Sequence, residues 1–117
     1  MLKIAIIIFA IGALGGLILA SHVLRGKLAP WGLSIVHMLL GATGLVLTAL
    51  VVLGGSDAGK GIIPIALVIL VVAALGGFYL ASIHARKVVA PKGVVLIHAG
   101  VAVIGFVLLL GGAFHFI

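Results

Sequence analysis

The sequence predicts an all-α membrane protein whose four transmembrane helices form two parallel-oriented helical hairpins in one four-helix bundle. Composition indicates the membrane, because 66% of the 117 residues are hydrophobic and only 7% are charged, whereas soluble proteins carry about 25% charged residues. Mean hydropathy is +1.64. Short polar segments divide the chain into apolar runs of 21 to 24 residues, and a helix needs about 20 residues to cross the hydrocarbon core. The lipid bilayer is therefore the expected surrounding of this chain.

Each apolar run is expected to form one helix, because a backbone surrounded by lipid must satisfy its own hydrogen bonds. Pro64 falls in the first turn of the third run, where a missing N–H does no harm. The first run has the length of a signal peptide, but the third run repeats its ALGG and LAS segments, so both are expected to remain as helices. The four runs cover residues 4–24, 33–53, 62–84 and 94–117.

An internal repeat relates the two halves of the chain. A shift of 61 residues aligns residues 13–47 with residues 74–108 at 15 identities in 35 positions. Repeat 1 then covers about 1–56 and repeat 2 about 57–117, within a single membrane domain that spans 1–117. Because each repeat holds two crossings, both repeats are expected to point the same way, related by a pseudo-two-fold axis along the membrane normal.

Positive charge predicts how the chain crosses the membrane. Five of the seven Lys and Arg residues fall in the first and third loops, at 25–32 and 85–93, while Lys3 and Lys60 fall on the other side. Because cytoplasmic loops carry an excess of Lys and Arg, these two loops are expected in the cytoplasm and both termini outside. A bacterial inner membrane is the expected location. The five cations are Arg25, Lys27, Arg86, Lys87 and Lys92.

Several classes of chemistry are excluded by what the chain lacks. It has no cysteine, which excludes disulfides, thiolate metal sites and cysteine nucleophiles. Asp57 is the only acid, so paired carboxylates for hydrolysis or for a di-metal site are missing as well. The net charge of +6 is accounted for by membrane topology, so nucleic acid is not an expected partner. We therefore expect an electron carrier or a binding protein, and not an enzyme.

Four of the five histidines fall in the cytoplasmic half of the predicted bundle. His22 and His84 end the first and third runs, whereas His37 and His98 lie roughly 9 Å inside the loops at about 1.5 Å rise per residue. A glycine lies seven residues deeper than each histidine, which is about two turns and nearly the same helix face. Each histidine is therefore expected to share its face with a patch free of side chains. These glycines are Gly15, Gly77, Gly44 and Gly105 for His22, His84, His37 and His98 in turn.

This pattern favours a flat macrocycle that stands upright between the helices. Haem iron takes axial imidazoles from facing helices, and the porphyrin plane needs room along them. A neutral, metal-bound imidazole also reduces the cost of placing a polar ring in lipid. The anionic propionates are expected to face the cytoplasmic surface and its cations. Arg25 and Arg86, which are repeat-equivalent, are the first candidates, with Lys27, Lys87 and Lys92 beside them.

The chain resembles small membrane b-type cytochromes, in which a four-helix bundle holds haem through histidines. The resemblance is carried by His37-x3-Gly41-x2-Gly44 and His98-x6-Gly105, each followed by a half-helix rich in leucine and valine. It covers two of the four helices, and the second copy has alanine where the first has Gly41. It implies electron transfer through one or two b-type haems, with a quinone pool or a neighbouring redox protein as partner.

Alternatives remain open at this level. His22 and His84 are 62 residues apart, which breaks the repeat register and rotates the two rings by about 100°, so they fit a second haem, a propionate contact or a plain interfacial position. The histidines could instead bind a bare Cu²⁺, Ni²⁺ or Zn²⁺ ion in a transporter. The glycine-rich faces also suit an accessory subunit of a larger complex, or a homo-oligomer.

Overall fold

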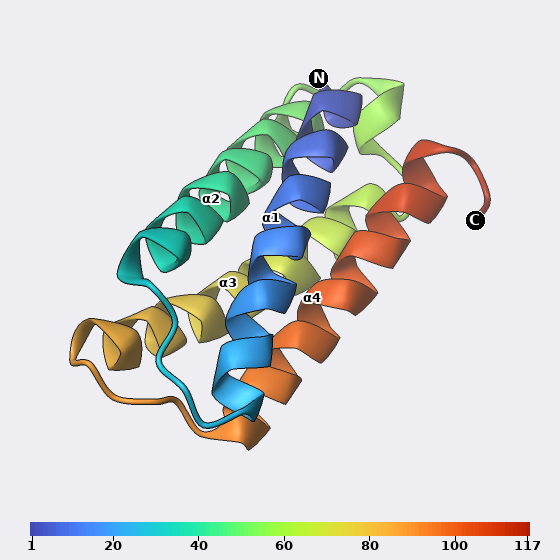
Figure 1. Cartoon of the computed structure of the whole chain (residues 1–117). Helices are drawn as coiled ribbons and strands as arrows, with labels where there is room; N and C mark the ends of the chain where they lie inside the picture. The colour runs from blue at the N-terminus through green and yellow to red at the C-terminus, as the bar shows by residue number, and fades with distance from the viewer.

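The computed structural model describes residues 1–117 and contains four long helices and one short 3₁₀ turn (Figure 1). Every long helix has 22 or 23 residues and is apolar enough to cross a membrane. The predicted all-helical fold is therefore confirmed. In chain order the elements are α1 (Leu2–Leu24), α2 (Trp31–Leu53), η1 (Asp57–Gly59), α3 (Ile63–Ala85) and α4 (Lys92–Ala113).

Proline and a left-handed residue set the helix boundaries at the loops. Pro30 and Pro91 are the N-caps of α2 and α4, with ψ of 132° and 131°, so both helices begin directly after a proline. Helices α1 and α3 end one residue before Arg25 and Arg86 and are followed by a residue with positive φ. At the C-terminus α4 stops four residues earlier than predicted, because the chain turns back and the Phe116 N–H donates to a carbonyl of α4.

The helices form two hairpins that run in the same direction. Most contacts fall within the hairpins α1–α2 and α3–α4, and further contacts join α2 to α3 and α1 to α4, which closes the bundle. Both termini and η1 lie at one end, here called the terminal end, and the loops 25–30 and 86–91 lie at the other, the loop end (Figure 1). This is the parallel arrangement that the repeat predicts.

The tightest packing lies in the half of the bundle near the terminal end. The buried cluster there draws on all four helices. Its members are Leu2, Ile6, Val51, Ile63, Ala66, Leu70 and Leu109. Outward-facing positions carry exposed aliphatic side chains such as Leu14 and Ile97, which the bilayer would cover. The half near the loop end is less densely filled, and the candidate site lies there.

Candidate functional site

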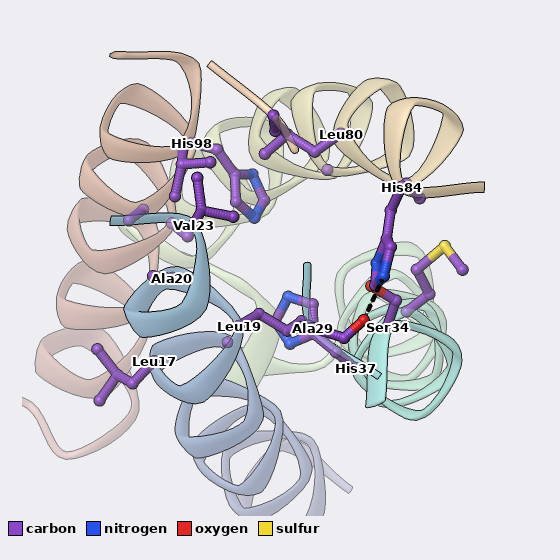
Figure 2. Close-up of a pocket in the computed structure, with 18 of the residues that line it drawn as sticks. Leu17, Leu19, Ala20, Val23, Ala29, Ser34, His37, Leu80, His84 and His98 are labelled. Atoms are coloured by element: carbon purple, nitrogen blue, oxygen red, sulfur yellow. Dashed lines mark hydrogen bonds between the residues drawn. The ribbon is translucent and has the colours of Figure 1, made fainter. Parts of the chain in front are cut away.

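His37 on α2 and His98 on α4 come together in the middle of the bundle. Their ring centroids are 6.3 Å apart and their planes make an angle of 86°. Figure 2 shows the two rings entering the space between the helices from different sides of the bundle. The repeat makes these two histidines equivalent, and the structure adds that their rings are neighbours.

Both rings are held by the same kind of hydrogen bond. The Nδ1–H of His37 donates to the Gly12 carbonyl at 2.7 Å, and the Nδ1–H of His98 donates to the Ala73 carbonyl at 2.8 Å. Gly12 and Ala73 are themselves repeat-equivalent, being 61 residues apart. Because a carbonyl can only accept, Nδ1 carries the proton, and in the neutral ring Nε2 then carries a free lone pair.

Two glycines on α1 and α3 make room for the rings. A Cβ on Gly16 would lie 2.8 Å from Cε1 of His37, and a Cβ on Gly77 would lie 2.9 Å from Cε1 of His98. Gly77, which was predicted to share a face with His84, lines the loop-side cavity as His84 does, and it also adjoins His98 of the neighbouring helix. Gly16 was not predicted at all, although the 61-residue shift pairs it with Gly77 and so signals its role.

Two cavities adjoin the histidine pair, and His37 and His98 line both of them. The loop-side cavity has a volume of about 230 Å³ and extends to the loop residues 27–29 and 88–90. The central cavity has a volume of about 170 Å³ and is otherwise apolar, with Phe9 and Phe106 in its wall. Nε2 of each histidine has no protein hydrogen-bond partner and is not sealed from the cavities. Both lone pairs are therefore available to a ligand.

His84 is engaged by the protein through both ring nitrogens. Its Nε2–H donates to the Ala29 carbonyl at 2.7 Å, and the Ser34 hydroxyl donates to its Nδ1 at 2.6 Å. The Trp31 ring meets it edge-on at 5.1 Å. His84 lines the loop-side cavity, but in this arrangement it has no free lone pair for a metal. It contacts the first hairpin from α3 and so ties the two hairpins together.

His22 lies apart from the other three. Its Nδ1 bonds the Ile18 carbonyl of its own helix at an exposed position, and it lines neither cavity. The structure therefore brings together two of the four histidines predicted as ligands and leaves His22 outside. The broken register explains this difference, because the residues that occupy its place and that of His84 in the other repeat are Ile83 and Val23.

The predicted glycine patches are largely filled by neighbouring side chains. The space at Gly44 is occupied by the Phe9 ring, and the space at Gly105 by Leu70. Gly15 faces Leu33 at ordinary contact distance. Side chains of neighbouring helices therefore pack on these three glycines, whereas the sequence predicted a surface left open for a ligand.

Only one of the five loop-end cations reaches a cavity. Lys27 lines the loop-side cavity. Arg25 and Arg86, predicted as cofactor contacts, line neither cavity, and their Nε–H groups donate to the carbonyls of Ser21 and Ser82 one turn back. No group of three or more side chains able to hold a metal ion is present.

The arrangement can bind a ligand through two neutral imidazole lone pairs in an apolar space. Comparison of the chain with models of protein families, with curated proteins and with solved structures finds no match. The chain is thus described by its fold, a four-helix membrane bundle, and by a histidine pair between two cavities.

Proposed function

We propose that this chain is a membrane haem protein that passes electrons, with one b-type haem held between His37 and His98. The observation that carries the proposal is the shared tautomer. Histidines that bind a metal commonly donate the other ring N–H to a carbonyl or carboxylate, which orients the ring and raises its basicity. Gly12 and Ala73 supply such carbonyls, one for each ring.

The separation of the rings supports a single metal between them. Metal–imidazole bonds are about 2.0–2.1 Å long, and the centre of an imidazole lies about 1.1 Å from its nitrogen. One ion between two facing rings therefore separates their centres by about 6 Å. The observed separation of 6.3 Å fits this value. No group of three or more side chains able to hold a metal ion is found, so the histidine pair alone would supply the protein ligands.

The volume and the lining of the two cavities favour a flat amphiphilic ligand over a bare metal ion. Sites for small ligands have volumes of about 300–1,000 Å³, and the two cavities together fall in this range. The apolar central cavity suits the hydrocarbon edge of a porphyrin, whereas the loop-side cavity reaches Lys27. Bound haem would supply one-electron chemistry at its iron. The protein would hold both rings in one tautomer and keep bulk water away from them.

His37 and His98 would both hold the group as protein ligands, and the chemistry that it would supply at such a two-histidine site is electron exchange. A quinone or a redox protein is the proposed partner. The excess of cations at the loop end further supports a topology with this end in the cytoplasm of a bacterial cell and both termini outside.

An optical spectrum of the purified protein tests the proposal. We expect a Soret band that shifts on reduction, and loss of most of it in His37→Ala and in His98→Ala. His115→Ala is the matched control, because His115 lies near the C-terminus away from both cavities. Circular dichroism and size-exclusion chromatography show whether each variant still folds.

Two outcomes would reject the proposal. One is the lack of a Soret band in the protein after reconstitution with haemin and removal of the unbound haemin, and the other is a band that the two ligand variants leave unchanged. Metal analysis separates the main alternative, since a stoichiometric first-row metal without porphyrin would instead favour a metal-transport protein.

A further inference from the structure

The loop-side cavity has a polar wall and an apolar wall that occupy equivalent places in the two repeats. Its polar side chains besides the histidine pair are Lys27, Ser34 and His84. A shift of 61 residues converts them to Val88, Val95 and Val23, and all three valines also line the cavity. Every polar member of this wall thus has an apolar counterpart across the pseudo-two-fold axis.

The polar wall is built around the first loop. Ser34 and His84 bond each other at 2.6 Å, and His84 also bonds Ala29, two residues after Lys27. In Figure 2, Ser34, Ala29 and His84 lie together on one side of the cavity, and Val23 lies on the other side near His98. The wall is therefore local to the junction of α2, α3 and the first loop.

Two-fold symmetry alone would let a ligand bind in two orientations with equal free energy. The histidine pair and the carbonyls that hold it are alike in both repeats, so they make no distinction between the orientations. The two walls differ, and so they do distinguish between the orientations. A ligand edge that carries carboxylates gains a cation at Lys27 on one side, whereas on the other side it would lose its hydration against valines.

We propose that the wall of Lys27, Ser34 and His84 is the recognition site for the carboxylate edge of the bound amphiphile and fixes its orientation in the bundle. This inference rests on the proposed function, because it takes the ligand to be an iron porphyrin. Lys27 supplies the charge. The Ser34 hydroxyl and the His84 ring form the polar surface beneath it, and the bond between them keeps that surface in place.

The test compares haemin with haemin dimethyl ester, in which both propionates are methyl esters and carry no charge. Each is titrated into the haem-free full-length protein in detergent, and the Soret band reports binding. We expect haemin to bind at least tenfold more tightly than the ester. In the triple variant Lys27→Val/Ser34→Val/His84→Val, which gives both walls the same three valines, this preference should fall to below about threefold.

A matched variant guards against a general charge effect. Lys87→Gly removes one cation at the same end of the bundle from a residue that lines neither cavity, at a left-handed φ of 59° that glycine adopts readily, and it should retain the preference for haemin. Lys27→Val alone is the second probe, in case the triple variant does not fold, and it should lose most of the preference.

Each result has a distinct meaning. Equal affinity of the wild-type protein for haemin and its ester would overturn the inference while leaving haem binding intact. A preference that survives Lys27→Val, or that is lost equally in Lys87→Gly, would overturn it too. If neither porphyrin shows a Soret band shifted from that of the free ligand in the same detergent, the proposed function itself fails.

Discussion

Replacing Gly16 or Gly77 by alanine should push the adjacent histidine ring away from its carbonyl. The new methyl group would lie 2.8 Å from Cε1 of His37 or 2.9 Å from Cε1 of His98, whereas ordinary contact begins at 3.4 Å. The ring must therefore move by about 0.5–0.6 Å. A shift of this size along the bond would stretch the Nδ1···O distance of His37 from 2.7 Å to about 3.3 Å.

The loss of stability is the difference between the cost of overpacking and the gain from alanine in a helix. Overpacking of this kind costs about 1–3 kcal/mol, which includes weakening of a hydrogen bond worth about 0.5–1.5 kcal/mol. Alanine in place of glycine inside a helix returns about 0.5–1 kcal/mol. We expect each variant to lose about 1–2 kcal/mol of stability, because the ring can swing partly into the cavities and relieve some of the clash.

Thermal unfolding of the haem-free protein in detergent, followed by circular dichroism, measures this loss without reference to any cofactor. Gly100→Ala is the matched control, because a Cβ there would meet no atom within 4 Å, and it should be neutral or stabilising. If Gly16→Ala and Gly77→Ala unfolded at the same temperature as Gly100→Ala, the described packing of the two rings would be refuted.

Two further predictions concern the loop end. Lys87 has a left-handed φ of 59° where repeat 1 has Gly26, so Lys87→Gly should raise stability by about 1 kcal/mol in the same thermal assay, and an unchanged or lower midpoint would contradict this. Ser34→Val and His84→Val should each destabilise by about 1 kcal/mol because each leaves a polar partner unpaired. The double variant should cost less than the sum of the two, and strict additivity in the double-mutant cycle would argue against a coupled pair.

The fold could be predicted because it depends on features that the sequence shows directly. Run length and hydropathy specify four crossings, and the 61-residue repeat specifies that the hairpins run in parallel. The ends of the helices were less certain, since an apolar run does not show where a helix stops. Helices α2 and α4 begin directly after Pro30 and Pro91, two residues earlier than predicted, and α4 ends at Ala113, where the chain turns back.

The histidine pair could be predicted from the repeat, but its surroundings could not. The groups that hold the rings are the carbonyls of Gly12 and Ala73. Every residue has a carbonyl, so the sequence does not show which one faces a neighbouring ring, because this depends on how each helix is rotated. A residue spacing along one helix likewise predicts a shared face, but it does not tell whether a side chain such as Phe9 from another helix fills that face.

The polar wall shows why the differences between the repeats matter as much as their likeness. At the interface between α2 and α3, Ser34 bonds His84. The equivalent interface between α4 and α1 has Val95 and Val23 at the corresponding positions. Valines therefore suffice for a hairpin junction in this fold. A polar pair at the level of a membrane helix gains only about 0.6 kcal/mol on average. Packing at this junction does not require the pair, which agrees with the proposal that the polar wall recognises a ligand.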